Sequence, residues 1–497
     1  MGVWKLRRVP PAIALAIGAI LIASTSAFAA PVAISGPSPY SACTAGAESG
    51  TLFPNAEVEP QVSVAGSFAV AAWQQDRWSD GGSHGIAGAA STDGGATWTR
   101  APLPFSVCAQ PYFGAVAPYE RASDPWVSIG PDGTVYANAL VFNDGNLDNG
   151  VYAATSHDGL HWNNLRAVVE YVGNGGKFST DKNAITADPI HAGVAYSVWD
   201  TLISPDHNPD NFPHAAAYTG EAYFSKTTDG GRSWSTPKVI FSNANRTQTI
   251  GNVIVVDSQT GALYDFASWI VKPNSSSNTQ YFAAFVKSTD GGTTWSAPKA
   301  IARMFAMGVG DPNTGAPLRT EDGIPSAAID PATGQLYVAW QESSTFKRGN
   351  NKFRSDDTIT LATSTDGGAS WTLKSPVNTF TGLPAFIPTV QVGTGGRVAI
   401  SYYDVRNLAA DNKSTLPADL WITYSNDHGA TFGGERHVAG PFNYLAAAFA
   451  LGFFLGDYQA LGAESGGFLP VFGMTNCNDA SCANNTNRQD IYAAPGF

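Results

Sequence analysis

The 497-residue sequence has few charged residues, few cysteines and no long apolar run after its first 30 residues. Charged residues make up only 14%, and 40 acidic side chains against 28 lysines and arginines give a net charge of −12. Without a basic tract, we expect no binding to nucleic acid phosphates or to an anionic membrane surface. The later apolar runs are too short to cross a bilayer, so the mature chain should have no membrane span.

Common catalytic signatures are missing as well. No GxSxG elbow, HExxH pair, phosphate-binding loop or dinucleotide fingerprint stands in a supporting context. The glycine-rich segment 173–181 lacks the spacing of a phosphate loop, so we interpret it as an ordinary loop. We expect no required cofactor, with Ca²⁺ as an open alternative that is taken up below.

The first 29 residues have the pattern of a secretory signal peptide. Three basic residues precede the apolar run AIALAIGAILIA, and the small-residue sequence AFA follows it. We therefore predict that residues 1–29 are removed and that residues 30–497 form one domain. The mature protein should be secreted, to the extracellular space or the periplasm, and we expect it to be a monomer.

All four cysteines lie in the predicted mature chain, and an even number in an oxidising compartment favours disulfides. Three pairings are possible, and we favour Cys43–Cys108 together with Cys477–Cys482. A four-thiolate metal site is the alternative, but the paired CxxC spacing is missing.

Six near-copies of one motif, Ser/Thr-x-Asp-x-Gly-x-x-Trp/Phe, recur along the chain. They read STDGGATW, SHDGLHW, TTDGGRSW, STDGGTTW, STDGGASW and SNDHGATF, and the second copy is one residue short. The Asp can accept hydrogen bonds from turn N–H groups, Gly supplies a positive φ, and the aromatic side chain fills space between strands. This chemistry indicates a structural role for the six box aspartates, which are Asp93, Asp158, Asp229, Asp290, Asp366 and Asp427.

A second motif, two strand-like runs around a Gly-containing turn, precedes each box and occurs a seventh time near residues 457–474. Each full unit therefore contains four strands, and repeated four-stranded antiparallel sheets are typical of a β-propeller. We predict an all-β propeller with seven blades, with six as the alternative. The N-terminal PVAIS should complete the last blade, which joins the chain ends and removes an exposed sheet edge.

The six boxes resemble the Asp-box, or bacterial neuraminidase, repeat found in sialidases and related propellers. The resemblance covers nearly the whole mature chain and implies a sialidase-like glycoside hydrolase that acts on an extracellular glycan. Asp boxes also occur in propellers with other substrates, so the fold does not by itself transfer the activity.

The first unit follows the order of features at the start of a sialidase. Pro60 matches the proline of the Arg-Ile-Pro strand start, Asp76 and Arg77 match a turn, and Asp80 matches the acid/base aspartate. Val58 stands where sialidases have an arginine that helps to grip the substrate carboxylate. Valine cannot replace a bidentate guanidinium, which argues against sialic acid as the substrate.

Acidic residues recur where the inner strands of the units begin. In a propeller these strands line the central channel, so their carboxylates should converge at one mouth. Three roles stay open: a strand-start turn, a Ca²⁺ site formed by Glu59, Asp124 and Asp181, or acid/base catalysis. The catalytic candidates are Asp80, Asp124, Asp322 and Tyr458, the last as a tyrosine nucleophile or as an ordinary channel residue.

Arginines near the same strand ends could bind an acidic sugar or pair with neighbouring carboxylates. The predicted substrate-binding residues are Arg77, Arg121, Arg319, Arg406 and Asp457. Two further hypotheses stand beside hydrolysis. One is a non-catalytic propeller that binds glycan or protein, and the other is a propeller of the polysaccharide-lyase type.

Overall fold

The structure is a computed structural model that describes residue 1 and residues 30–203, 219–241, 247–271, 280–305, 308–320, 323–343, 356–476 and 488–497. The predicted leader, Asp322, Cys477 and Cys482 lie outside these described residues. Strands dominate the described chain, and the helical segments within it are short 3₁₀ turns such as Val107–Ala109, Thr394–Gly396 and Tyr444–Ala446. None of the described helices is long and apolar enough for a membrane crossing.

The first four strand units follow one another along the chain. The first contains β3 (Val58–Ala65), β4 (Phe68–Trp78), β5 (Ser83–Ser91) and β6 (Thr99–Pro102). The second contains β7 (Arg121–Ile129), β8 (Val135–Phe142), β9 (Asn149–Ser156) and β10 (Asn163–Tyr171). The third contains β11 (Phe178–Ala187), β12 (Ala195–Ile203), β13 (Thr219–Thr227) and β14 (Lys238–Phe241). The fourth contains β15 (Thr247–Val256), β16 (Leu263–Val271), β17 (Gln280–Ser288) and β18 (Lys299–Met304).

Three more units complete the series. The fifth contains β21 (Ser326–Ile329), β22 (Leu336–Ser343), β23 (Asp357–Ser364) and β24 (Thr372–Lys374). The sixth contains β25 (Ala385–Val392), β26 (Val398–Asp404), β27 (Pro417–Ser425) and β28 (Gly433–Asn443). The seventh contains β31 (Ala460–Ala463), β32 (Phe468–Thr475), β33 (Gln489–Ala493) and the N-terminal β1 (Val32–Ala33).

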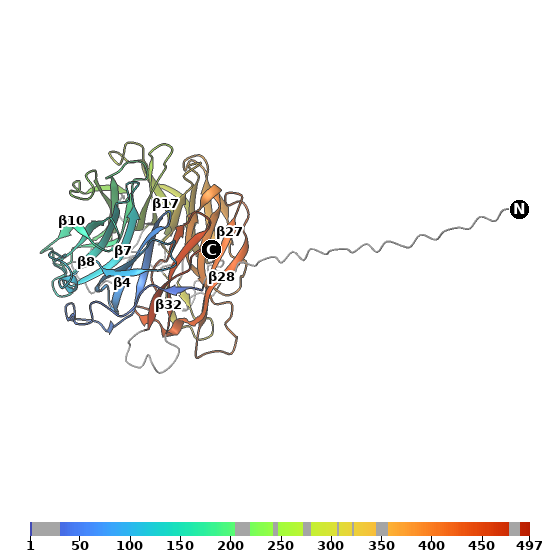
Figure 1. The fold of residues 1–497 in the computed structure, drawn as a ribbon, viewed down its shortest axis with the longest axis horizontal. Helices are drawn as coiled ribbons and strands as arrows, with labels where there is room; N and C mark the ends of the chain where they lie inside the picture. Colours follow the sequence, from blue (N-terminus) through green and yellow to red (C-terminus); the bar gives the residue numbers. More distant parts are fainter. Residues whose placement is uncertain are drawn as a thin grey trace.

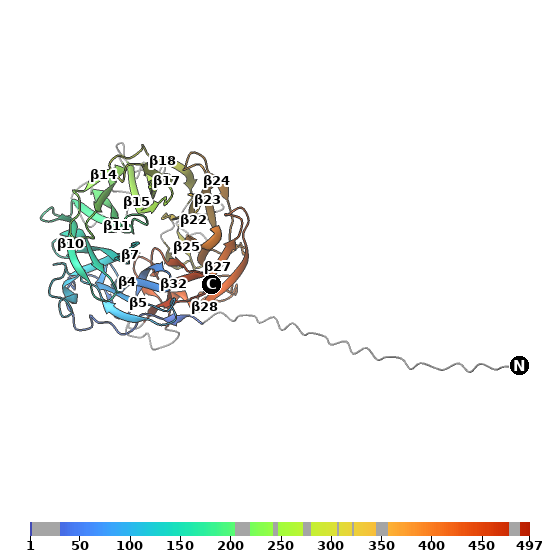
Figure 2. The same ribbon diagram turned by 45° about the horizontal axis from the view of Figure 1, so that its top comes forward.

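Each unit is a four-stranded antiparallel meander, as the repeat predicted. The first two units share one larger sheet only because Ser83 pairs with Ala122. β1 pairs with β33 through Val32–Ala493 and Ala33–Tyr492, so the two ends of the described chain meet in one sheet. The first strands of successive units contact one another, and β31 also contacts β3. The sheets thus surround a common axis, which the turned view shows as a ring (Figures 1 and 2).

Side chains on the first strands bind the neighbouring first strand and hold this inner ring together. Ser63 Oγ accepts from the Ile129 amide at 3.0 Å, and Thr186 Oγ1 donates to the Ile254 carbonyl at 2.8 Å. Comparable bonds connect other neighbours, namely Ser128–Ala187, Ser326–Val390 and Thr389–Gln459. These bonds satisfy polar groups that the channel would otherwise bury unpaired.

The Asp boxes occupy the turns between the third and fourth strands. In the first box Asp93 accepts from the Thr97 amide at 2.9 Å and from Ser91 Oγ at 2.8 Å. Trp98 Nε1 donates to the Gly95 carbonyl at 2.8 Å, while its ring packs on the core formed by units one and seven. The other five boxes repeat the Asp–Ser/Thr bond, and each aromatic joins a core cluster.

A small extra sheet lies outside the seven units. It contains β19 (Val309–Gly310), β20 (Pro317–Arg319), β29 (Ala448–Phe449) and β30 (Phe453–Phe454), and β20 and β30 pair in parallel. A further short strand, β2 (Leu52–Phe53), pairs with β4. Within this sheet the Arg319 guanidinium lies 4.3 Å from the centre of the Phe454 ring.

Cys43 and Cys108 form a disulfide, as expected. It ties the segment before the first unit to the loop between the first two units. The second expected pair, Cys477–Cys482, stays a prediction because both residues lie outside the described chain.

Candidate functional site

The first strands of three units carry a bulge that turns a charged residue toward the channel. Glu59, Asp124 and Lys182 have φ values of 54°, 49° and 43°, which non-glycine residues adopt rarely. The ladder pairing shifts at each of these positions. Strained backbone of this kind persists when the surrounding structure holds it, and it is common at functional sites. Here the bulges bring charged groups from three distant segments to one place.

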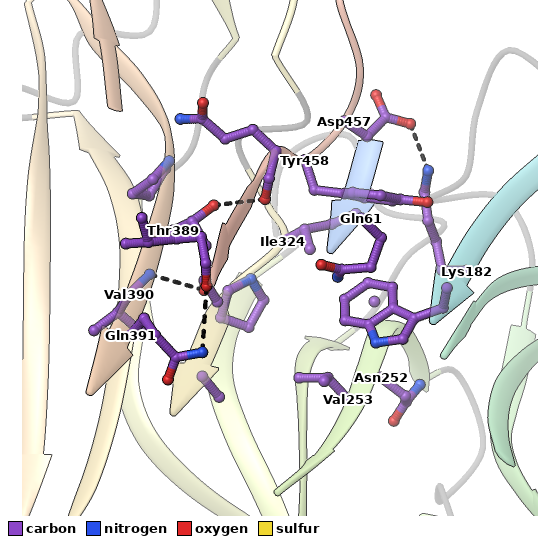
Figure 3. A pocket seen from close by; sticks show the side chains of 18 of the residues that line it. Gln61, Lys182, Asn252, Val253, Ile324, Thr389, Val390, Gln391, Asp457 and Tyr458 are labelled. Carbon is purple, nitrogen blue, oxygen red and sulfur yellow. Dashed lines mark hydrogen bonds and ion pairs between the residues drawn. The ribbon is translucent and has the colours of Figure 1, made fainter. Parts of the chain in front are cut away.

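Lys182 is the centre of the resulting cluster. Its ammonium lies 2.5 Å from Asp457, 3.4 Å from Glu59 and 3.6 Å from Asp124. All four side chains are at least nine-tenths buried. Figure 3 shows Lys182 and Asp457 joined at one side of the pocket.

Arg319 supplies a second cation to the same carboxylate. Its Nε and Nη2 atoms lie 2.8 and 2.5 Å from the two oxygens of Asp457, which is a bidentate pair. Burial would raise the pKa of Asp457, but Arg319 and Lys182 hold that pKa well below its usual range. Asp457 is therefore ionised and saturated with donors.

The other carboxyls of the cluster have different proton affinities. Burial raises the pKa of Glu59, although the Lys182 ammonium opposes the change. Burial would also raise the pKa of Asp124, but Lys182 more than offsets it, so the pKa of Asp124 is lowered. Burial, with Asp124 and Asp457 nearby, raises the pKa of Asp181 to about 6. Neighbouring carboxyls whose pKa values differ in this way can take separate roles, one as the acid and the other as the base.

Tyr458 lies among these carboxyls. Burial, followed by the charges of Glu59 and Asp124, raises its pKa well above the ordinary value. Its hydroxyl is 3.5 Å from the Pro125 carbonyl, and its ring lies 5.5 Å from the Trp126 ring. The tyrosine is therefore neutral, and it must lose its proton to a neighbour if it attacks a substrate.

A cavity of about 230 Å³ occupies the channel next to this cluster. Lys182, Asp457 and Tyr458 line one part of it, with Gln61 beside them (Figure 3). Trp126 lines it too, with its ring next to that of Tyr458. Apolar side chains also line the cavity, among them Val253, Ile324, Ile387, Val390 and Leu461, together with amide and hydroxyl side chains such as Asn252, Thr389 and Gln391. Its volume is below the range of roughly 300–1,000 Å³ of drug-sized ligand pockets, so it suits one small ligand.

Ca²⁺ binding was one of three open roles for Glu59, Asp124 and Asp181, and a protein cation lies among these residues. Glu59 and Asp124 face the Lys182 ammonium, which takes the place of a cation between them. Among the described residues, no group of three or more His, Cys, Asp or Glu side chains is arranged to hold a metal.

Asp80 and Arg121 meet each other in a different cluster. Arg121 Nη1 lies 2.9 Å from Asp80, and its Nη2 lies 3.0 Å from Asp144. The guanidinium also donates to the carbonyls of Gly46, Ser49 and Gly81. Arg121 is buried, and protein acceptors occupy its guanidinium, whereas the Asp80 side chain is one-third exposed.

The remaining predicted arginines are placed as follows. Arg77 is buried near the channel cluster, where burial and the charge of Arg319 lower its pKa to about 10. It lies near the end of β4, as does Asp76, and not in the expected turn. Arg406 pairs with Asp404 at 2.5 Å and with Glu435 at 2.7 Å, in the sixth unit. Asp322 is outside the described residues and stays a prediction.

The sequence interpretation missed three features of the site. Lys182 was noticed only as the neighbour of Asp181, although its place in the repeat matches that of Glu59 and Asp124. Trp126 and Gln61 follow the two prolines of the first two strand starts and line the cavity. An alignment of the first strands of all units at their bulge positions identifies these three residues as site candidates.

Comparisons with known proteins agree with the repeat. Residues 221–450 match the family of the BNR repeat-like domain. No curated protein sequence matches the chain.

The solved structures that match this chain have low identity and TM-scores below 0.5. The Hadza microbial sialidase Hz136 is 13% identical with a TM-score of 0.47, over 85% of this chain and 73% of its own. The alpha-L-arabinanase of Penicillium chrysogenum with arabinobiose is 12% identical with a TM-score of 0.45, over 76% and 94%. The Trypanosoma rangeli sialidase with the inhibitor DANA is 11% identical with a TM-score of 0.43, over 80% and 56%.

Proposed function

We propose that this chain, a member of the sialidase-like superfamily with BNR-type Asp-box repeats, is a secreted glycoside hydrolase that removes a terminal sugar from an extracellular glycan. One observation carries the proposal: Lys182, Asp457 and Tyr458 line a cavity that suits one small ligand, and the carboxyls of Glu59 and Asp181 lie beside Lys182. Glycoside hydrolysis needs a proton donor at the leaving oxygen and a second group on the opposite side of the sugar.

Asp181 is the proton donor in this proposal. A pKa of about 6 keeps much of this carboxyl protonated in mildly acidic solution, as a general acid requires. It gives its proton to the glycosidic oxygen while the bond from that oxygen to C1 breaks, and the aglycone leaves as an alcohol. Tyr458 attacks C1 and passes its proton to a neighbouring carboxylate. Water then attacks C1 and gives one proton to Asp181. As the bond from C1 to the Tyr458 oxygen breaks, the neighbouring carboxyl returns its proton to that oxygen, which releases the sugar and restores Tyr458.

Asp80 remains the other candidate acid, from the resemblance of the first unit. Its side chain is more exposed than that of Asp181, and one of its oxygens lies 2.9 Å from Arg121. Substitutions can distinguish Asp181 from Asp80, because the two side chains bind different partners.

We also propose that the seven strand units are the seven blades of one closed propeller. Pairing of β1 with β33 and contact of β31 with β3 support closure between the chain ends. Removal of residues 1–29 would leave β1 next to the new N-terminus, which is compatible with secretion of the mature domain.

A non-catalytic propeller that binds glycan is the second candidate. It is favoured by the internal pairing of the site: Arg319, Arg121 and Arg406 each bind protein carboxylates. Val58, in the place of the sialidase arginine, is buried and apolar. Such a site could hold a sugar without cleaving it.

Incubation of the purified mature chain with a panel of fluorogenic glycosides tests the proposal. The panel contains sialosides, α-L-arabinosides, galactosides, glucosides and xylosides. We expect turnover of at least one member, and a loss of at least 100-fold in kcat with Tyr458→Phe. Asp132→Asn, in an exposed turn of the second unit, serves as the control that keeps wild-type kcat. Glycan binding without any turnover would overturn the hydrolase and support the second candidate.

A further inference from the structure

We infer that the channel mouth selects a terminal sugar without a carboxylate group. This inference rests on the proposed site, since it names the substrate class that the same cavity admits. It depends on which protein groups already bind the cationic side chains of the described chain.

Lys182, which lines the cavity, and Arg319 are both bound to one protein carboxylate. Arg319 holds Asp457 with two contacts of 2.8 and 2.5 Å, and Lys182 holds the same carboxylate at 2.5 Å. Lys182 also faces Glu59 and Asp124. Asp457 therefore occupies the position in which a substrate carboxylate would be recognised.

The other candidate arginines cannot replace these two. Arg77 is 3% exposed, donates to Gln74 and the Gly82 carbonyl, and does not line the cavity. Arg121 is saturated by Asp80, Asp144 and three carbonyls. Arg406 is tied to Asp404 and Glu435.

An acidic sugar would meet the ionised Asp457 carboxylate at the cavity wall. Asp457 lines the cavity, and Glu59, Asp124 and Asp181 lie around Lys182. A substrate carboxylate would have to displace Asp457 from two cations or remain unpaired near these groups. Placing like charges together strongly disfavours a wrong partner.

The remaining walls suit a neutral sugar. The aromatic side chain of Trp126 lines the cavity, and the walls from Val253 and Ile324 are apolar, as the C–H face of a sugar ring requires. Gln61, Asn252 and Gln391 place neutral amides among these walls (Figure 3). A mostly apolar pocket with a few placed polar groups is the usual form of a small-ligand site.

Calorimetric binding to matched sugars tests the inference without requiring turnover. The probes are methyl glycosides of galactose and glucose, the same glycosides of galacturonic and glucuronic acid, methyl arabinofuranoside, and N-acetylneuraminic acid. We expect a neutral member to bind the full mature chain at least tenfold more tightly than its acidic counterpart. Tighter binding of any acidic member, or no binding of any neutral member, overturns the inference.

A pair of variants tests the physical cause. Asp457→Asn frees Arg319 and Lys182 from a competing carboxylate, so binding of an acidic probe should improve at least tenfold. Asp404→Asn frees Arg406 from a similar pair outside the cavity and should leave the preference unchanged. If both variants leave it unchanged while circular dichroism shows them folded, Asp457 is not the cause and the inference fails.

The outcome also separates this inference from the proposed function. A neutral sugar that binds but is never hydrolysed leaves the inference standing and removes the hydrolase. Preferred hydrolysis of an acidic glycoside supports the hydrolase and overturns the inference.

Discussion

The Lys182 ammonium lies 2.5 Å from the Asp457 carboxylate, although 275 residues separate them in the chain. Lys182 belongs to the first strand of the third unit, and Asp457 precedes the first strand of the seventh. The pair therefore joins units that are not neighbours in sequence, across the mouth of the channel. Its strength depends on the whole ring of sheets being in place.

Replacing Lys182 by methionine should destabilise the protein strongly. The change leaves Glu59, Asp124 and Asp457 buried without their shared cation, and such a loss costs about 3–5 kcal/mol. Chemical denaturation at pH 7 measures the difference. The control is Lys299→Met, on an exposed strand position, for which we expect less than about 0.5 kcal/mol. Equal stability of the two variants would show that the ion cluster does not hold the mouth together.

The raised pKa of Asp181 has a defined effect on stability. Its pKa is about 6 in the folded chain and about 3.9 in an unfolded one, so the folded state binds the proton more tightly. The stabilisation that protonation provides is complete below pH about 4 and is lost as pH rises through about 6. Asp181→Asn removes this titration.

We therefore expect Asp181→Asn to gain stability relative to wild type as pH rises from about 4 to 7. Melting temperatures of both proteins across that pH interval check the sign. A constant difference at every pH would mean that Asp181 does not titrate with a raised pKa.

The Asp boxes predict a contrast between two adjacent glycines. Gly291 and Gly292 have φ values of 64° and 80°, so alanine at either position bears a strain of about 1–2 kcal/mol. An added Cβ at Gly292 would also lie 2.4 Å from the Phe224 ring of the preceding unit, whereas at Gly291 its nearest neighbour is the Lys226 amine at 3.9 Å. Gly292→Ala should therefore lose about 1–3 kcal/mol more than Gly291→Ala. Similar losses in denaturant unfolding would argue against the packing of this box on its neighbour.

Removing the disulfide should lower the stability of the first unit. Cys43 and Cys108 are 65 residues apart, and closing a loop of that size contributes about 4 kcal/mol in the chain-entropy model. The double variant Cys43→Ala/Cys108→Ala should show an earlier unfolding transition than wild type under non-reducing conditions. With a reductant present, the difference should largely disappear, and a difference that persists would point to lost packing instead.

Repetition made the fold predictable from the sequence. Each box is a local turn whose hydrogen bonds join residues two to four positions apart, so its structure follows from the motif alone. The number of boxes and strand motifs in the sequence also predicted four strands per unit and the pairing of the N-terminal segment with the last strand.

The site was less predictable, because it depends on contacts between distant segments. Whether Lys182 faces the channel depends on a bulge with a positive φ, which no residue type at that position requires. Arg121 was a substrate-binding candidate, but segments around Gly46 and Asp144 enclose it. The convergence of Glu59, Asp124, Asp181 and Asp457 was expected from their positions at strand starts. The Lys182 ammonium among them was not expected.

The most direct test compares two carboxyl variants on whichever glycoside the wild-type protein cleaves best. The proposal predicts that Asp181→Asn lowers kcat/KM by about 10²–10⁴-fold, the range that one general acid supplies. Asp80→Asn should retain kcat/KM within tenfold, because its carboxylate serves the Arg121 cluster. Full activity in Asp181→Asn, with activity lost in Asp80→Asn, would contradict the account and move the chemistry away from the channel mouth.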